Sequence, residues 1–385
     1  MNPRRVLANL FILTVLTVRT GASQANPSQA AALMTQRIAE VEPMLSALVE
    51  SYGVSGMEAP VREVVRHYLP AWASAETDTA GNLWVRAGSG SPQVVFVAHL
   101  DEIGFRVSAL REDGTLELER LGGFYPSLFE GRPALVHTGN RSVPGIFRPR
   151  ERDEAADAGD AGAPGKGAHR TPPPLRVDVG TSSRAATEAL GIREGSTVTM
   201  PKAYQRLAGT RATARSFDDR VGCVALLLAL RRLDPKRLRH EVIFIFSVRE
   251  EIGLDGARIA AAALGIKPVR VHAVDTFVSA DSPLELSTFA LAPLGQGAVV
   301  RALDTSSATP PAYLDTLRIL ARPRAIALQV GATNGGNDGS TFAPYGVPDV
   351  PLGWPLRYSH SPVEVVDLKD VEALAEIVQA SAEGW

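Results

Sequence analysis

Cysteine is almost absent from this sequence, because the 385 residues include only Cys223. A single cysteine cannot form an internal disulfide, so folding does not require an oxidising compartment. Cys223 lies inside an apolar segment, where we interpret it as a small core residue rather than a nucleophile or a metal ligand. Neither a repeat of solenoid length nor a Gly-x-Ser-x-Gly elbow is visible, so the sequence gives no sign of a repeat architecture or of a serine nucleophile of that type.

An excess of charge of either sign is also missing. The formal net charge is −2, from 40 basic and 42 acidic residues, which removes any general electrostatic case for nucleic acid as a partner. Hydrophobic residues make up 45% and charged residues 21% of the chain, as in ordinary globular proteins. The length is sufficient for one large domain and a smaller one.

The N-terminal residues 1–25 have the order of a secretory signal peptide. Arg4 and Arg5 precede an apolar run at 6–18, and small residues then lead to Ala25, after which we expect cleavage. The run is too short to span a bilayer comfortably. We therefore expect an exported protein, periplasmic or secreted, with no integral membrane span after processing. A buried N-terminal helix or a misassigned start codon is the alternative, and the uncleaved protein would be cytoplasmic.

Several apolar runs lead to residues that bind divalent metals. The clearest run, at 241–247, is rich in Val, Ile and Phe and is followed by Glu250 and Glu251. It indicates a buried strand, because it is short and is followed by glycines. The same pattern recurs at 94–98, 269–274 and 350–354, which lead to His99, Asp275 and His360. A buried helix expected at 221–230 begins after Asp218.

These side chains are expected at one edge of a sheet, because open α/β sheets bind ligands beyond the carboxyl ends of their strands. An isolated Glu-Glu pair most often lies in a solvated loop, so a metal site is indicated only because several strand ends of this kind converge. Two imidazoles and several carboxylates form the ligand set of a di-zinc or di-cobalt hydrolase, in which one carboxylate bridges the metals.

The remaining pattern indicates an α/β domain interrupted by a small all-β domain. Helices are expected at 30–52, from Pro60 onward, and at 257–263, 312–320 and 368–382, with a further strand at 325–330. Short strand-like runs separated by Gly and Pro turns lie at 132–137, 141–147, 175–179 and 196–200. We predict a catalytic domain from 26–107 and 209–385 and an inserted β-barrel at 108–208. Within it, 151–174 has almost nothing to bury, which predicts a disordered surface loop.

Taken together, the motifs resemble one known family. They are HLDEIG at 99–104, FDDRVG at 217–222, EEIG at 250–253, the lone Asp275, LGQG at 294–297 and RYSHS at 357–361. This set is similar to the glutamyl aminopeptidase and tetrahedral aminopeptidase family of di-metal exopeptidases, some members of which have been labelled endoglucanase M. The resemblance implies a three-layer α/β/α, zinc-peptidase-like catalytic domain with an inserted β-barrel. It also implies a homo-oligomer, in which the barrel helps dimers pack into large shells.

The resemblance implies a role for each matching residue. His99 and Asp275 would bind one metal, Glu251 and His360 would bind the other, and Asp218 would bridge the two. The cofactors would be two divalent metal ions per subunit, zinc or cobalt, with manganese as a further candidate. Glu250 would be the general base, and Asp101 would hold the His99 ring through its second nitrogen. We interpret Asp219 and Arg220 as a charge pair that braces the start of the helix.

The predicted activity is the removal of N-terminal residues from peptides. A hydroxide bridging two metals roughly 3.5 to 4 Å apart would attack the scissile carbonyl. Glu250 would carry the proton from water to the departing amine. The surplus of carboxylates favours a substrate with a free, positively charged N-terminus.

Two alternatives stay open at this point. A related di-metal carboxypeptidase or amide deacylase would use much the same ligands, but it would prefer a cation to hold a substrate carboxylate. A non-catalytic binding protein on a peptidase fold would be expected to have lost ligands. The endoglucanase label has no support in the sequence, because the paired carboxylates fit metal ligation better than the acid and base of a glycosidase.

Overall fold

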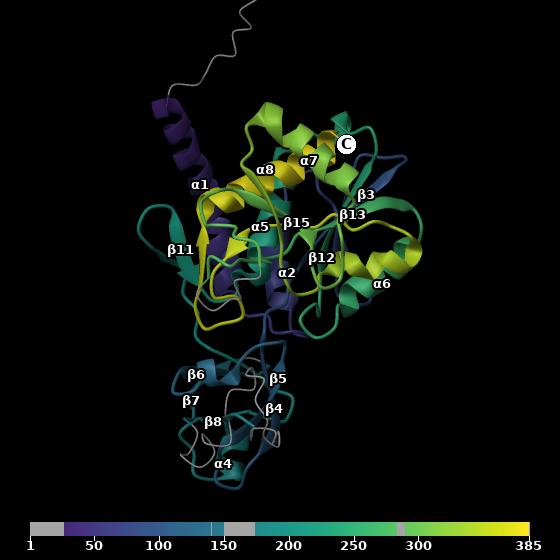
Figure 1. Cartoon of the computed structure of the whole chain (residues 1–385). Coiled ribbons are helices and arrows are strands. Elements are labelled where there is room, and N and C mark those ends of the chain that lie inside the picture. Colours follow the sequence, from purple (N-terminus) through teal and green to yellow (C-terminus); the bar gives the residue numbers. More distant parts are fainter. Residues whose placement is uncertain (1–26, 140, 150–173, 283–288, 385) are drawn as a thin grey trace, which may run out of the picture.

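The computed structural model describes residues 27–139, 141–149, 174–282 and 289–384. The predicted signal peptide and nearly all of the predicted loop at 151–174 therefore lie outside the described residues. Figure 1 shows an α/β body and a smaller β domain that projects from its lower end. None of the helices within the described ranges has both the length and the apolar character needed to cross a bilayer.

The central sheet of the body has five strands in the order β1-β2-β12-β3-β13. Their bounds are β1 (Ala75–Thr77), β2 (Leu83–Ala87), β3 (Gln93–His99), β12 (Glu241–Ser247) and β13 (Pro268–Ala273). Because β12 and β13 run parallel to β3, the carboxyl ends of these three strands meet at one edge. Both faces of the sheet are covered, which is why these strands are continuous apolar runs in the sequence.

Two hydrophobic cores lie on opposite faces of this sheet, because successive side chains of a strand alternate. On one face, Phe96 and Phe244 stack with ring centroids 5.4 Å apart and pack with helices α1, α2, α5, α7 and α8. On the other face, Val95 and Ile243 pack with α6 and the 3-10 segment η4. The bounds are α1 (Pro27–Glu50), α2 (Ala59–Tyr68), α5 (Phe217–Arg232), α6 (Asp255–Leu264), α7 (Pro311–Ala321), α8 (Leu368–Gly384) and η4 (Asp338–Tyr345). The predicted α/β/α class is confirmed.

Three smaller sheets extend the body. Strand β15 (Ala298–Leu303) lies between β16 (Leu328–Ala332) and β17 (Leu352–Gly353), β11 (Arg211–Ala214) lies between β10 (Gln205–Arg206) and β19 (Glu364–Asp367), and β14 (Phe277–Val278) pairs with β18 (Pro355–Leu356). The strand expected at 325–330 begins later, because a 3-10 turn at Arg322–Arg324 ends with Ala325 in the left-handed region at φ 53°.

The smaller domain is a closed barrel with the strand order β4-β5-β8-β7-β6-β9. The bounds are β4 (Gly104–Leu110), β5 (Leu116–Leu121), β6 (Pro133–His137), β7 (Ser142–Phe147), β8 (Arg176–Asp178) and β9 (Thr197–Thr199), with a short helix α4 (Arg184–Ala189). Its core is aromatic, with Phe105 packed against Phe124, Phe129 and Phe147 at centroid distances of 5.0 to 5.2 Å. The first barrel strand begins at Gly104, before the expected boundary at 108. Only four residues therefore separate the barrel from the strand that ends on His99.

Candidate metal centre

Four of the five predicted ligands come together at the carboxyl edge of the central sheet. Asp218, in the first turn of α5, directs Oδ1 to His99 Nε2 at 3.2 Å and Oδ2 to His360 Nε2 at 3.2 Å. Glu251, in the turn after β12, places Oε1 3.4 Å from His360 Nε2. Within the described ranges, one ligand atom from each of His99, Asp218 and Glu251 lies within 4.8 Å of the others. A single carboxylate thus faces two imidazoles, one with each oxygen.

The residues present fit a divalent metal. Imidazole nitrogens and carboxylate oxygens are the donors that zinc and related ions prefer. Glu251 Oε1 is buried, and among the described residues it has the ion-pair contact with His360 Nε2 at 3.4 Å but no hydrogen bond of good geometry. A buried carboxylate oxygen without a donor is costly unless a cation satisfies it. This observation favours cation binding over a merely structural cluster.

Asp275, the fifth predicted ligand, follows β13 but does not belong to the compact group of three residues. Its carboxylate forms an ion pair with the buried Arg301, with 3.2 Å between Oδ2 and Nη1. Burial raises the pKa of Asp275 to about 6, against the lowering effect of Arg301, and the negative charge of Asp218 raises it further. Asp275 therefore lies close enough to Asp218, at the same sheet edge, for the charge of Asp218 to raise its pKa.

Asp101 lies fully buried beside His99. His99 Nδ1 is 3.2 Å from the backbone oxygen of Asp101 and 3.5 Å from its carboxylate Oδ1. The same carboxylate accepts hydrogen bonds from Ser55 Oγ at 2.6 Å and from the backbone N–H groups of Glu250 and Glu251 at 3.0 and 3.2 Å. Asp101 therefore holds both the His99 ring and the turn that carries the two glutamates.

The electrostatics of this edge follow from its surplus of carboxylates. Burial raises the pKa of Glu250 well above its usual range, although His99 opposes the effect, and the charges of Asp275 and Glu251 add to it. Burial lowers the pKa of each histidine, but nearby carboxylates outweigh it and raise both pKa values well above the usual range, Glu250 chiefly for His99 and Glu251 chiefly for His360. Such an excess of buried negative charge is the electrostatic condition for binding cations.

The expected charge pair between Asp219 and Arg220 is wrong. Asp219 Oδ2 accepts a hydrogen bond from the backbone N–H of His99 at 2.8 Å. Arg220 Nη2 instead lies 3.6 Å from Glu102 Oε1. Neighbouring residues at a helix start do not face each other, so the two side chains reach different partners.

Two acidic residues at the site were missed by the sequence reasoning. Asp338 contacts Ser247 Oγ through its carboxylate, at the end of β12. Glu364 accepts hydrogen bonds from the backbone N–H groups of Phe217 at 2.6 Å and His360 at 3.1 Å, so it connects the start of α5 to the histidine. These contacts join residues far apart in the chain. The glycine-rich surroundings of Asp338 are the one local signal that points to a site loop.

A cluster of imidazoles and carboxylates beyond the ends of three parallel strands is the arrangement expected of a metal-dependent hydrolase. The sequence profile of the family described as M42 glutamyl aminopeptidase matches residues 81–377. The chain belongs to this family and is a metallo-aminopeptidase, as the resemblance predicted.

Individual relatives agree with this assignment. The chain is 31% identical over 355 residues to a lysyl aminopeptidase of Pyrococcus furiosus, which covers 88% of this chain and 96% of the relative. It is 28% identical to a glutamyl aminopeptidase of Lactococcus lactis, over 86% of this chain and 92% of the relative. A solved structure of the TET1 peptidase of Pyrococcus horikoshii, described as assembling into a tetrahedron or a large octahedral shell, matches with a TM-score of 0.78 at 29% identity, covering 90% of this chain and 100% of that one.

Proposed function

We propose that the chain removes single residues from the free N-terminus of peptides and that it holds two divalent metal ions. The proposed ligands are His99 and Asp275 for one ion, Glu251 and His360 for the other, and Asp218 for both. The observation that carries this proposal is the position of Asp218, whose two oxygens each lie 3.2 Å from a different imidazole nitrogen. A bridging carboxylate needs this division of its oxygens.

The bound metals would supply Lewis acidity, which activates water and polarises the scissile carbonyl. Glu250 is the residue that we assign as general base. Its Oε2 lies 3.9 Å from His99 Nε2, and 13% of its side chain is exposed, so the carboxylate borders the cluster and can be reached by water. It would take a proton from water and return it to the departing amine. Asp101 positions this base, because its carboxylate accepts the backbone N–H of Glu250.

The charges around the site favour an aminopeptidase over a carboxypeptidase or a deacylase. A carboxypeptidase needs a free cation for the substrate carboxylate, but the nearby arginines are already engaged. Arg301 is bound by Asp275 and by Asp304, at 3.2 and 3.1 Å. Arg357 is bound by Asp281 at 2.7 Å. The surplus of carboxylates instead suits the ammonium group of a free N-terminus.

The test uses the purified mature protein and a panel of amino-acid p-nitroanilides with free or acetylated N-termini. We expect cleavage of free-amine substrates, loss of activity with a chelator, and recovery when Zn²⁺, Co²⁺ or Mn²⁺ is added back. Cleavage confined to acetylated substrates would favour the deacylase. No cleavage of any free-amine substrate under all of these conditions would refute the aminopeptidase proposal.

Export and assembly complete the proposal. The order of charged, apolar and small residues at 1–25 supports removal of a signal peptide, so that the mature protein begins near Asn26 and acts in the periplasm or outside the cell. N-terminal sequencing of protein from its host tests this, and an intact Met1 on cytosolic protein would contradict it. The barrel, and the assembly of the TET1 relative into a tetrahedron or a large octahedral shell, support a homo-oligomer, which light scattering of the mature protein would measure.

A further inference from the structure

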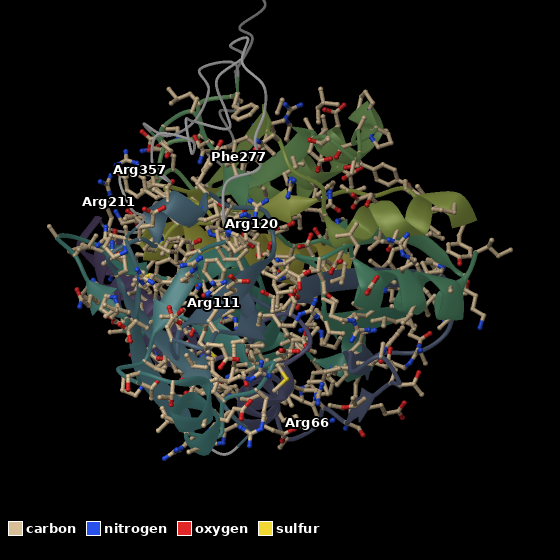
Figure 2. All side chains as sticks on the ribbon, turned by 90° about the horizontal axis from the view of Figure 1, so that it is seen from below. Arg66, Arg111, Arg120, Arg211, Phe277 and Arg357 are labelled. Carbon is tan, nitrogen blue, oxygen red and sulfur yellow. The ribbon has the colours of Figure 1, made fainter. Side chains whose placement is uncertain are left out.

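The inserted barrel reaches the metal centre through the loop that follows β5. Gly122 and Gly123 come directly after the last residue of this strand. The carbonyl oxygen of Gly123 lies 2.6 Å from Nδ1 of His360, although the two residues are 237 positions apart. In Figure 2, which views the molecule from below, Arg120 of β5 lies between Arg111 of the barrel and Phe277 of the body.

The contact fixes which nitrogen of His360 carries the proton. A carbonyl oxygen can only accept a hydrogen bond, so Nδ1 must be a donor. When the ring is neutral and binds a metal, Nε2 is therefore the nitrogen that keeps its lone pair. Nε2 lies 3.2 Å from Asp218 Oδ2 and 3.4 Å from Glu251 Oε1. A ligand histidine commonly has this arrangement, in which an acceptor on the far nitrogen sets the orientation of the ring.

The two histidines of the site differ in what holds them. His99 is held within the body, by Asp101 from the end of its own strand, and only 3% of its side chain is exposed. The side chain of His360 is 31% exposed, and its Nδ1 is held by the barrel loop. Glu364 holds the backbone N–H of His360 but not the ring. The orientation of this ring therefore depends on the position of the barrel.

We propose that the loop Gly122–Gly123 is a positioning element of the metal centre, which directs His360 Nε2 toward the metal that Glu251 also binds. The inference rests on the proposed function, because it assumes that His360 is a ligand. It assigns to the barrel a part in the active site of its own subunit. A displacement of the loop should weaken the metal site of Glu251 and His360 and spare the site of His99.

Gly122 lets the loop approach this closely. Its φ of +106° lies in the region that favours glycine, and a Cβ there would lie 2.6 Å from Ile103 Cγ2 and 3.4 Å from Glu251 Oε2. Gly195 provides a matched control in the same barrel. Its φ is +89°, but a Cβ there would meet no atom within 4 Å. Alanine at either position therefore strains the backbone, whereas only Gly122→Ala pushes the loop away from the site.

The experiment compares wild type, Gly122→Ala and Gly195→Ala as full mature proteins. Each is freed of metal and titrated with Co²⁺ while visible absorption is recorded, and bound ions are counted by plasma mass spectrometry. We expect two equivalents in the wild type and in Gly195→Ala. In Gly122→Ala one equivalent should bind as before and the other about 10- to 100-fold more weakly, the usual effect of removing an outer partner of a ligand. Both variants should lower the melting temperature through backbone strain, and Gly122→Ala should lower it further through its contact with Ile103.

Two metal equivalents of unchanged affinity in Gly122→Ala would overturn the inference. Equal losses of metal affinity in the two variants would also overturn it. A wild type that binds fewer than two ions would instead contradict the proposed function. Should Gly122→Ala fail to fold, the ring ¹⁵N shifts of His360 in the metal-free wild type decide the question. They are recorded at a pH high enough for the ring to be neutral, with His360→Gln used to assign the signals. A neutral ring with its proton on Nδ1 supports the inference, and a proton on Nε2 overturns it.

Discussion

Two buried charge clusters begin at neighbouring residues of the chain and differ in sign. Asp101 turns toward the metal centre, and Glu102 turns toward a second cluster between the body and the barrel; both are fully buried. Glu102 accepts hydrogen bonds from Lys202 Nζ and the backbone N–H of Gly53, each at 2.8 Å. It also pairs with Arg215 and lies 3.6 Å from Arg220. One carboxylate is thus surrounded by three cations.

The cations around Glu102 bind mainly to groups of the protein itself, although Nε of Arg215 and Nε of Arg220 have no hydrogen-bond partner among the described residues. The spare N–H groups of its cations donate to backbone carbonyls, Lys202 to Ser51 at 2.8 Å, Arg215 to Ile103 at 3.1 Å and Arg220 to Leu48 at 3.4 Å. Burial alone would raise the pKa of Glu102, but the surrounding cations lower it well below its usual range. A buried cation excess that is bound to carbonyls has a structural role.

The metal centre has the opposite balance. The ion pairs of Asp218, Glu250 and Glu251 within the described residues are all with histidines, and no lysine or arginine pairs with them there. The two clusters show how a ligand-binding charge cluster differs from one with a structural role. An anionic cluster whose acceptors are left unsatisfied calls for an added cation, whereas a cluster with an excess of buried cations does not.

The largest effect is expected at the two adjacent glutamates of the metal centre. Glu250→Gln keeps the size of the side chain but removes the proton acceptor, so we expect turnover to fall by about 10² to 10⁴ while both metals stay bound. Glu251→Gln replaces an anionic ligand with a neutral one. It should lose one metal on dialysis and recover part of its activity in excess Zn²⁺ or Co²⁺, because mass action reverses a loss of affinity.

Turnover of a p-nitroanilide and metal counts on dialysed protein measure both outcomes. If Glu250→Gln loses a metal ion while Glu251→Gln retains two, the two roles are reversed. The family's motif would then have been aligned to this sequence one residue out of register.

The next effect tests the second cluster. Glu102→Gln leaves Lys202, Arg215 and Arg220 buried without their common anion, and breaking a buried ion cluster in this way typically costs about 3 to 5 kcal/mol. We expect the free energy of unfolding to fall by that amount in urea denaturation. Added Zn²⁺ should not restore it, because the groups that lose their partner are themselves cations and do not bind a metal ion. Full rescue by metal would place Glu102 in the metal centre and remove the distinction between the clusters.

The sequence predicts the metal centre better than it predicts this second cluster, for a physical reason. Continuous apolar runs require strands covered on both faces, and residues that follow such parallel strands share one edge, so His99 and Glu251 could be placed together from local pattern alone. The partners of Glu102 come from segments that carry no such signal. The carbonyl of Gly123 could not be foreseen either, because its contact with His360 depends on how the barrel sits on the body.

A smaller effect is expected from His137, at the barrel side of the second cluster. Burial lowers the pKa of His137 to about 4. The unfolded chain would take up a proton near its ordinary pKa of 6.5. The stabilising contribution of the neutral ring is therefore complete above pH 6.5 and is lost as the pH falls toward 4.

We expect the wild type to lose about 1 to 2 kcal/mol more than His137→Gln between these pH values, after allowance for the partial exposure of the ring. Melting temperatures of both proteins across this range measure the difference. Parallel curves would mean that another group causes the acid sensitivity.

The smallest effect is expected from the same chemical change as in the second cluster, made at an exposed ion pair of the barrel. Arg106 Nη2 lies 2.7 Å from Glu119 Oε2, close to the 2.8 Å between Lys202 Nζ and Glu102 Oε1, but about half of each side chain of the exposed pair is accessible, 48% and 53%. Water and salt screen such a pair, so Glu119→Gln should cost no more than about 0.2 to 1 kcal/mol, and less at high salt. Urea denaturation at low and high ionic strength, run beside Glu102→Gln, measures both. Equal losses in the two variants would show that distance rather than burial sets the strength of these pairs, and the contrast between the two clusters would then lose its energetic basis.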